Sequence, residues 1–188
     1  MRVISGQAKG HRLKVPKGRA VRPTADRVKE ALFNILPHDL SGLRVLDLFA
    51  GTGNLSAEAL SRGAAAAILV DFSPKVRRTI RENLRMLGFS DRSELWTVSV
   101  LQSVRLLSRR GETFDLIFFD PPYEKGWVGK ILSAIARAGL LREAGIVVAE
   151  HSSREKVREN YEALGLQDQR RYGSTVLSFF GLGKAVVP

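Results

Sequence analysis

At 188 residues the chain has the length of one domain, its 44% content of hydrophobic residues is enough for a core, and no apolar run approaches the roughly 20 residues of a membrane span. The absence of cysteine excludes a disulfide framework and a thiolate metal site, and the N-terminus lacks the apolar stretch of a signal peptide, so we expect a soluble cytoplasmic protein. The net charge of +11 points to a polyanion as partner.

Basic side chains dominate the start of the chain, where the stretch from Arg2 through Arg22 holds no acidic residue. The alternation over residues 11–15 predicts a strand, and Gly6 to Gly10 predicts the turn that pairs this strand with residues 3–4. We therefore expect a small basic hairpin that grips the polyanion, and a solvated or disordered arm is the alternative. The basic residues of this stretch are Arg2, Lys9, Arg12, Lys14, Lys17, Arg19 and Arg22.

A helix is expected to begin at residues 23–25, Pro-Thr-Ala, where Thr24 can act as a cap and Asp26 suits the first turn. Arg27 and Lys29 are expected on its polar face. The spacing by itself indicates an amphipathic helix docked on a core. Its apolar residues, at helical spacing, are Val28, Ala31, Leu32, Ile35 and Leu36.

Residues 45–54 read Val-Leu-Asp-Leu-Phe-Ala-Gly-Thr-Gly-Asn, a buried-strand pattern that runs into a glycine turn and then a helix expected over residues 55–62. Glycines let the backbone approach a ligand closely, and a helix N-terminus offers unpaired N–H groups. The next apolar run ends in Asp71, at the place where nucleotide folds grip a ribose diol. This pattern predicts a cofactor pocket, and a plain strand-to-helix turn is the alternative.

The glycine spacing narrows the choice of cofactor. After Gly51-Thr52-Gly53 the chain continues Asn-Leu-Ser, so the third glycine of the dinucleotide fingerprint is missing. The turn also lacks the Gly-Lys-Ser/Thr sequence of a phosphate loop. A turn that binds pyrophosphate is therefore disfavoured.

Ser73-Pro74 reads as a cap followed by proline at the first position of the next helix. On this helix Arg77, Arg81 and Arg85 fall at i, i+4 and i+8, where like charges repel by roughly 0.2–0.5 kcal/mol per pair. A phosphate backbone would offset this repulsion, but a hydrated stripe is the favoured interpretation. The helix is expected to be buried through Val76, Ile80, Leu84 and Leu87.

The rest of the chain alternates strand and helix patterns, which implies a parallel sheet covered on both faces. Strands are expected at residues 95–98, 114–119 and 145–149. Helices are expected at residues 103–109, 128–138 and 155–164. The end of the chain reads as a hairpin of residues 167–171 and 175–180 around Gly173-Ser174.

Asp120-Pro121-Pro122-Tyr123 follows the apolar run 116–119. Proline has no N–H and holds the preceding residue extended, so the two central residues of this loop offer no hydrogen-bond donor. An exocyclic amine in the loop would find only acceptors, the Asp120 carboxylate and the Pro121 carbonyl, with the Tyr123 ring available for stacking. The tetrad is thus a candidate amine-binding loop, and a plain strand terminator is the alternative.

Residues 47–53 with Asp71 look like the S-adenosylmethionine site of the class I methyltransferases, and residues 120–123 look like their amino-methylating subset. The resemblance implies an α/β fold with a Rossmann-like seven-stranded sheet, mostly parallel with a C-terminal antiparallel hairpin. It further implies a methyltransferase domain over residues 41–188 and an N-terminal extension, a basic hairpin and a helix, over residues 1–40. Further stretches similar to the bacterial 16S ribosomal RNA guanine-N2 methyltransferases of the small subunit are residues 2–6, 22–34, 58–64 and 172–173.

This resemblance implies direct methyl transfer from S-adenosylmethionine to N2 of a guanine in 16S ribosomal RNA, on a base flipped out of its helix. Asp120, Pro121 and Tyr123 are the expected catalytic residues. The resemblance assigns to the cofactor Asp47, Phe49, Ala50, Gly51, Gly53, Asp71, Phe72, Gln102 and Ser103. The residues expected to bind RNA are Arg2, Lys9, Arg12, Lys14, Arg22 and Arg27.

Two of these assignments depart from the family pattern or have a competing interpretation. The family has an acidic or amide residue followed by Ala after its third strand, to read the adenine amino group, and here Gln102-Ser103 is aligned to that pair. Phe72 is a candidate to stack on the adenine, and a buried aromatic at a strand end is the alternative.

Other functions stay open at this point. The amine-binding loop would also suit N6 of adenine or N4 of cytosine, so an adenine methyltransferase acting on DNA or RNA is the nearest rival. A ribosome-assembly factor without enzyme activity is a second alternative. Methylation of pyrimidine C5 through a thiolate is excluded, because the chain has no cysteine. The three histidines show no ligand spacing, so we expect no metal, and we expect a monomer.

Overall fold

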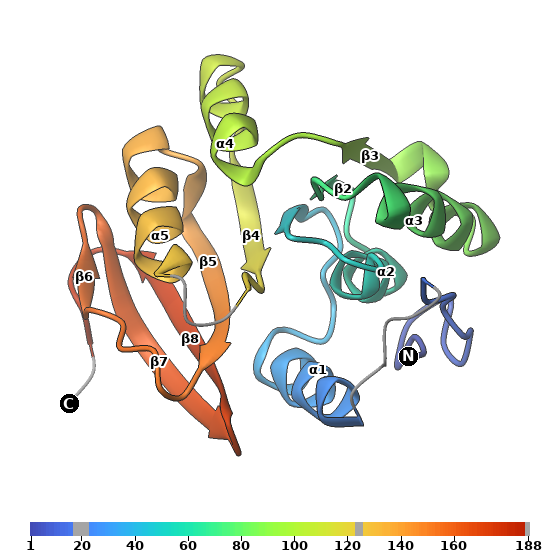
Figure 1. Cartoon of the computed structure of the whole chain (residues 1–188), viewed down its shortest axis with the longest axis horizontal. Helices are drawn as coiled ribbons and strands as arrows, with labels where there is room; N and C mark the ends of the chain where they lie inside the picture. Colours follow the sequence, from blue (N-terminus) through green and yellow to red (C-terminus); the bar gives the residue numbers. More distant parts are fainter. Residues whose placement is uncertain (17–22, 123–125, 187–188) are drawn as a thin grey trace. The chain divides into compact units, whose positions relative to one another are not determined.

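The computed structural model describes residues 1–16, 23–122 and 126–186, drawn in colour in Figure 1. They form two compact units, Met1–Val98 and Ser99–Pro188, and each is described by itself. The expected division of the chain after residue 40 stays a prediction. In the described residues no helix is long and apolar enough to cross a membrane.

The first unit contains three parallel strands, because each strand is followed by a helix or turn that returns the chain to the same edge of the sheet. β2 pairs in parallel with β1 on one side and with β3 on the other. The strands β1 and β2 are almost wholly buried, as their apolar sequences predict. The elements are α1 Pro23–Ile35, β1 Arg44–Leu48, α2 Asn54–Ser61, β2 Ala66–Val70, α3 Pro74–Met86, the 3-10 helix η1 Ser90–Arg92 and β3 Ser93–Trp96.

The basic N-terminal segment, residues 1–16, folds back on itself as predicted. Arg2 and Arg12 form an antiparallel bridge, and the Val3 amide donates to the His11 carbonyl at 3.0 Å. The Gly10 amide in turn donates to the Val3 carbonyl at 2.9 Å. The predicted hairpin is therefore present, although its arms are too short to form regular strands.

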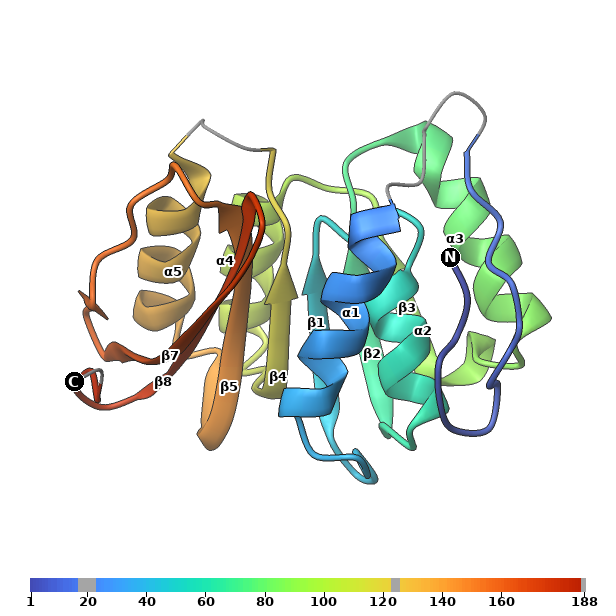
Figure 2. The same ribbon diagram turned by 90° about the horizontal axis from the view of Figure 1, so that it is seen from below.

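This segment is also docked on the rest of its unit, so residues 1–14 are not the solvated arm of the alternative interpretation. The Gln7 amide donates to the Ser61 carbonyl at 2.8 Å, and the Ala8 amide donates to the Ser61 hydroxyl at 2.9 Å. Farther along, the Lys14 amide donates to the Asn83 side chain on α3 at 2.8 Å. Figure 2 shows the segment running beside α3.

Replacing Gly6 with alanine should destabilise the protein by more than the roughly 1–3 kcal/mol expected for backbone strain alone, because the new Cβ would also clash with Ser61. Gly6 has a φ of +78°, and a Cβ there would lie 1.8 Å from the Ser61 carbonyl oxygen. Urea unfolding measures the loss. Gly10→Ala is the matched control, because Gly10 also has a positive φ but its Cβ would meet nothing within 4 Å. Equal losses in both variants would contradict a role for the close contact with Ser61.

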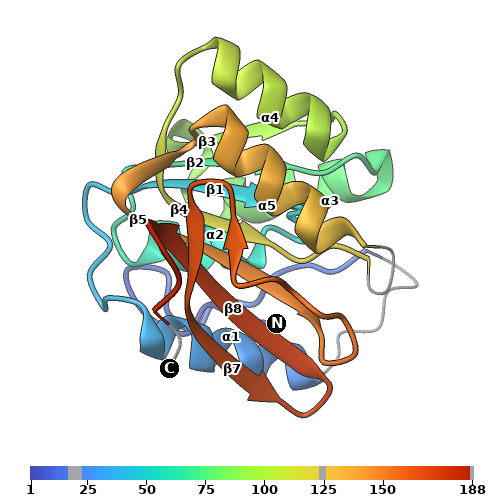
Figure 3. The same ribbon diagram turned by 90° about the vertical axis from the view of Figure 1, so that its left-hand side faces the viewer.

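The second unit combines a parallel pair of strands with antiparallel strands at the end of the chain. β4 and β5 pair in parallel, whereas β5–β8 and β7–β8 are antiparallel. The predicted C-terminal hairpin is confirmed, with its turn at Gly173-Ser174 between β7 and β8 (Figure 3). The elements are α4 Val100–Arg109, β4 Phe114–Phe119, α5 Trp127–Ala138, β5 Leu141–Ser152, β6 Asn160–Tyr161, β7 Leu164–Tyr172 and β8 Thr175–Leu182.

The helix expected over residues 155–164 is wrong, since this stretch contains a loop, the short strand β6 and the start of β7. Tyr161 explains the difference, because its buried ring packs edge-on against Phe180 with the centroids 5.7 Å apart. Its hydroxyl accepts a hydrogen bond from the Arg158 amide at 2.9 Å, and the Arg158 guanidinium lies over its ring. These tertiary contacts outweigh the helical propensity of the polar residues around Tyr161.

The predicted place of Lys29 on the polar face of α1 is also wrong. Lys29 is 2% exposed, and its ammonium forms an ion pair with the buried carboxylate of Glu58 at 3.4 Å. Arg27, in contrast, is exposed as expected. Desolvation lowers the pKa of Lys29, and the charge of Glu58 opposes that shift.

The helix α3 matches its predicted pattern closely. Pro74 is its first residue, and Ser73 occupies the cap position, although the Ser73 side chain makes no capping hydrogen bond. Val76, Ile80 and Leu84 are buried, whereas Leu87, also predicted to be buried, is half-buried because it lies just after the end of the helix. The arginine stripe of Arg77, Arg81 and Arg85 is exposed, as expected for either a hydrated or a phosphate-binding face.

Candidate active site

The glycine turn, residues 49–54, joins the carboxyl end of β1 to α2. Gly51 and Gly53 have φ values of +59° and +74°, in the left-handed region that glycine adopts without strain. Phe49 also has a positive φ, +64°, which is costly for a residue with a side chain. Such backbone conformations persist where the surrounding structure imposes them, and they cluster at ligand sites.

Asp71, at the carboxyl end of β2, fixes this turn. One of its carboxylate oxygens accepts the Gly51 amide at 2.9 Å, and the other accepts the Ser73 amide at 2.8 Å. Each carboxylate oxygen has a second lone pair, so Asp71 retains the capacity to accept hydrogen bonds from a ligand diol. The Ala50 amide donates to the Val70 carbonyl at 3.0 Å, which ties the turn to β2 a second time. The predicted neighbourhood of the glycine turn and Asp71 is thus present in the first unit.

Asp47 lies under the turn and is 2% exposed. Its carboxylate accepts hydrogen bonds from the Ser56 hydroxyl at 2.7 Å and from the Ser56 amide at 3.2 Å. Burial raises the pKa of Asp47 from 3.8 to about 7, against the opposing effect of the Ser56 hydrogen bonds, and the charge of Asp71 adds to the rise. A cationic group bound at the turn would favour the ionised form of Asp47.

The raised pKa of Asp47 predicts a pH dependence of stability. A carboxyl group whose pKa is raised by folding stabilises the folded state at low pH, and this stabilisation is lost as the pH rises through the folded pKa of about 7. Wild-type protein should therefore lose stability relative to Asp47→Asn between pH 5 and pH 8, by at least roughly 1.4 kcal/mol, the linkage energy of one pKa unit. Urea unfolding at several pH values measures the difference.

Asp39→Asn is the control for this pH series. Hydrogen bonds from Ser41 lower the pKa of Asp39, so its contribution is lost only as the pH falls below the carboxyl range. The stability difference between wild type and Asp39→Asn should stay flat from pH 5 to pH 8. A flat difference for Asp47→Asn as well would contradict the raised pKa of Asp47.

Phe72 follows Asp71 and is 74% exposed, so the alternative of a buried aromatic is wrong. Its ring is accessible for stacking beside the carboxylate that fixes the glycine turn. Left-handed glycines, an anchored carboxylate and an accessible aromatic ring together fit an adenosine-type cofactor at this edge of the first unit.

Gln102 and Ser103, the pair aligned to the adenine-reading residues, lie in the first turn of α4 in the second unit. The Ser99 hydroxyl caps this helix by accepting the Gln102 amide at 3.3 Å. The Ser103 side chain is buried, and its hydroxyl donates to the Val100 carbonyl at 2.7 Å. Gln102 is exposed. Their assignment to the cofactor stays a prediction.

The amine-binding loop begins where β4 ends, at Phe119. β4 is buried over most of its length, which holds the start of the loop in place. Asp120 is exposed at the carboxyl end of the strand, Pro121 is buried and Pro122 is exposed. Pro121 and Pro122 have no N–H, so this part of the loop offers acceptors. Tyr123 lies outside the described residues.

The residues expected to contact RNA lie on the first unit. Arg2, Lys9, Arg12, Lys14 and Arg27 are all exposed, and Arg22 lies outside the described residues. The Lys14 ammonium pairs with Glu82 of α3 at 3.0 Å. Their exposure fits contact with a polyanion.

The prediction that no metal is bound stays a prediction. In the part of the chain that the structure describes, no group of three or more His, Asp or Glu side chains is arranged to hold a metal ion. His151, for example, is buried, and its ring nitrogens are hydrogen-bonded to the Ser152 carbonyl and the Ser178 hydroxyl at 2.9 and 2.8 Å.

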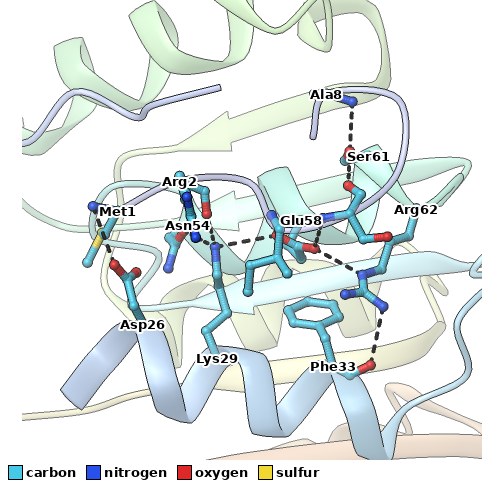
Figure 4. A network of polar contacts seen from close by, with 12 residues as sticks. Met1, Arg2, Ala8, Asp26, Lys29, Phe33, Asn54, Glu58, Ser61 and Arg62 are labelled. Carbon is cyan, nitrogen blue, oxygen red and sulfur yellow. Dashed lines mark hydrogen bonds and ion pairs between the residues drawn. The ribbon is translucent and has the colours of Figure 1, made fainter. Parts of the chain in front are cut away.

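A buried ionic cluster behind the glycine turn was missed by the sequence reasoning (Figure 4). The Glu58 carboxylate accepts the amides of Ile4 and Ser5 at 2.7 and 3.0 Å, pairs with Lys29, and accepts Arg62 Nε at 3.0 Å. Glu58 itself was the available signal in the sequence, since it is the charged residue of α2 and stands among small apolar residues. An ionised group is buried only with partners, so a buried Glu58 implies nearby cations or N–H donors.

A comparison with family models matches residues 1–181 to the family described as conserved hypothetical protein 95. The chain is 37% identical over 180 residues to a putative rRNA methyltransferase from Bacillus subtilis, which covers 96% of this chain and 98% of that protein. It is 33% identical over 150 residues to the ribosomal RNA small subunit methyltransferase D of Escherichia coli, which covers 80% of this chain and 74% of that protein.

Solved structures agree with this likeness at the level of the fold. A putative methyltransferase from Escherichia coli superposes with a TM-score of 0.83 at 24% identity, covering 97% of each chain. A putative methyltransferase, SMU.776, complexed with S-adenosylhomocysteine (SAH), superposes with a TM-score of 0.68 at 18% identity, covering 85% of this chain and 50% of that chain. The α/β class with a mostly parallel sheet and antiparallel C-terminal strands, predicted from the sequence, is confirmed.

Proposed function

The chain belongs to the conserved hypothetical protein 95 family, and we propose that it methylates the exocyclic N2 of a guanine in 16S ribosomal RNA of the small ribosomal subunit. It is a methyltransferase of the class I fold that depends on S-adenosylmethionine. The choice of guanine N2 and of a flipped-out base belongs to the proposal. We also propose that the protein is a monomer and that it is located in the cytoplasm.

The observation that carries the proposal is the run of hydrogen-bond acceptors after β4. An exocyclic amine donates two hydrogen bonds, and the start of this loop offers the Asp120 carboxylate and the Pro121 carbonyl. Pro121 and Pro122 supply no competing donor, since proline lacks an N–H. A carbonyl oxygen or an unprotonated ring nitrogen of a base needs a donor, and neither Pro121 nor Pro122 provides one.

Asp120 and Pro121 would act on the amine by orientation. The lone pair of a guanine amine is delocalised into the ring, and acceptors that hold both N–H bonds turn that lone pair toward an electrophile. Orientation of this kind can lower a barrier by several kcal/mol. The Asp120 carboxylate would also stabilise the positive charge that develops on the nitrogen, and it need not be a strong base because the proton can leave late.

The base has to leave its helix for this chemistry, because the amine of a paired guanine is already hydrogen-bonded. Tyr123 would then stack on the flipped base, a contact that contributes roughly 1–3 kcal/mol per base in other proteins. The exposed basic residues of the first unit would bind the phosphates, and such contacts weaken steeply with salt.

S-adenosylmethionine, when bound, supplies a methyl group made electrophilic by the sulfonium. The anchored Asp71 would accept from the ribose hydroxyls, the exposed Phe72 would stack on the adenine, and Asp47 would face the cationic part of the cofactor. The remaining residues proposed to hold the cofactor are Phe49, Ala50, Gly51, Gly53, Gln102 and Ser103.

The test is to identify the modified nucleoside. We expect 16S ribosomal RNA from a strain that lacks the protein to gain one N2-methylguanosine when protein and S-adenosylmethionine are added back, as measured by mass mapping after digestion. N6-methyladenosine in RNA or DNA would overturn the proposal in favour of the adenine methyltransferase. RNA binding without any methyl transfer would overturn it in favour of the assembly factor.

A further inference from the structure

Two buried side chains join the basic N-terminal segment to the glycine turn within the first unit. Asn83 reaches them from α3, and Lys29 reaches them from α1. The segment carries residues proposed to bind RNA, and the turn carries residues proposed to hold the cofactor. The two surfaces are therefore linked through a few defined hydrogen bonds.

Asn83 makes the link with its whole amide group. It is 1% exposed, and its oxygen accepts the Lys14 amide at 2.8 Å. Its nitrogen donates to the Lys14 carbonyl at 3.1 Å and to the Thr52 carbonyl at 3.0 Å. Thr52 lies between the two left-handed glycines of the turn. One side chain thus holds the backbone of Lys14 and the backbone of the turn.

Lys29 forms a second link at the other end of the segment (Figure 4). Its ammonium donates to the Arg2 carbonyl and to the Asn54 side chain at 2.5 and 2.9 Å, beside its ion pair with Glu58. Asn54 is the last residue of the turn and the first of α2. The Thr52 hydroxyl also donates to the Met1 sulfur at 3.3 Å. The segment therefore contacts the turn at both of its ends.

Packing alone does not explain why the buried residue at position 83 is an asparagine. Burying an amide without hydrogen bonds costs a few kcal/mol, and an apolar side chain at a buried position carries no such cost. Asn83 lies with Ile80 and Leu84 on the buried face of α3, where the other buried residues are apolar. Its three hydrogen bonds to two separate segments point to a role in holding those segments together.

We propose that Asn83 is a positioning residue that couples RNA binding by the N-terminal segment to cofactor binding at the glycine turn. A cofactor that fixes the turn would fix the Thr52 carbonyl, hence the Asn83 amide, and hence the backbone that presents Lys14. Linkage makes the effect reciprocal, so RNA held by the segment tightens cofactor binding by the same factor. The RNA-binding part of this inference rests on the proposed function. The part that concerns the glycine turn needs only that the cofactor binds there.

The first test measures the coupling by calorimetry, with SAH as an unreactive cofactor probe and a 16S ribosomal RNA transcript as the second ligand. RNA should tighten SAH binding to the wild-type protein about five-fold or more, as is typical of coupled sites. In Asn83→Leu this factor should fall at least two-fold but stay above one, because the link through Lys29 remains, whereas in Glu82→Gln it should stay near the wild-type value. Glu82 pairs with Lys14 at the surface and does not contact the turn, so it is the matched control.

The second test needs no variant. SAH should slow hydrogen exchange of the Lys14 amide in the wild-type protein, because that amide is bonded to Asn83. SAH binding without protection of Lys14, or an unchanged coupling factor in Asn83→Leu, would overturn the coupling and leave the proposed function intact. Failure of SAH to bind at all would overturn the proposed function and the coupling with it.

Discussion

Asp120→Ala should lower the methyl-transfer rate by roughly 10³-fold while S-adenosylmethionine binds with nearly unchanged affinity. Removing one preorganised electrostatic group typically costs 10²–10³ in kcat, and here the loss of orientation of the amine adds to that cost. The residues proposed to hold the cofactor do not include Asp120, so the affinity for the methyl donor should persist. A tritiated-methyl assay on 16S ribosomal RNA measures turnover, and calorimetry measures donor affinity.

Two further variants sharpen this prediction. Asp120→Asn keeps one oxygen acceptor but turns an NH2 donor toward the amine, so its rate should fall between those of wild type and Asp120→Ala. Asp115→Asn is the matched control, because Asp115 lies on the same strand but pairs with Arg142 at 2.8 Å. Wild-type turnover in Asp120→Ala, or an equal loss in Asp115→Asn, would show that Asp120 does not hold the amine.

The order of strands and helices could be predicted where the local pattern and the tertiary environment agree. α3 begins at Pro74 as expected, because proline fixes the backbone of a first helical residue. The strand β5, predicted over residues 145–149, extends over Leu141–Ser152 instead. Its later residues pair with β8, and a partner so distant in sequence leaves no trace in the local alternation. The loop and strand at residues 155–164 were missed for the same reason.

The local geometry of the glycine turn was also predictable, whereas the buried ion pair between Lys29 and Glu58 behind it was not. Gly51, Gly53 and Asp71 follow from motif spacing, and the structure gives them left-handed backbone and a direct hydrogen bond. Lys29 was placed with Arg27 on the polar face of an amphipathic helix. It is buried because Glu58, 29 residues away, forms its ion pair, and such pairings depend on packing that a single helix pattern does not contain.

Glu58→Gln should destabilise the protein by about 3–5 kcal/mol, the cost of removing one partner from a buried ion pair. Glu58 is fully buried and pairs with two cations, Lys29 and Arg62, that are themselves buried. Without the carboxylate both positive charges would lie in a low dielectric without their shared counter-charge, although Lys29 would keep the weaker attraction of Asp26 and Arg62 its bond to the Phe33 carbonyl. Urea unfolding measures the loss. Glu82→Gln, which breaks exposed ion pairs, should leave the unfolding midpoint nearly unchanged.

A double-mutant cycle shows whether the loss comes from the unpaired charge. Lys29→Met removes one of the two cations and keeps the length of the side chain, so it should also destabilise the wild-type protein, which then contains Glu58 with a single counter-charge. In the Glu58→Gln background the same change removes a charge that has already lost its partner. The two losses should therefore be less than additive by about 0.5–3 kcal/mol, the range for directly interacting residues. Additive losses would mean that Glu58 and Lys29 stabilise the first unit independently, and that the Ile4 and Ser5 amides and the Arg62 guanidinium account for the role of Glu58.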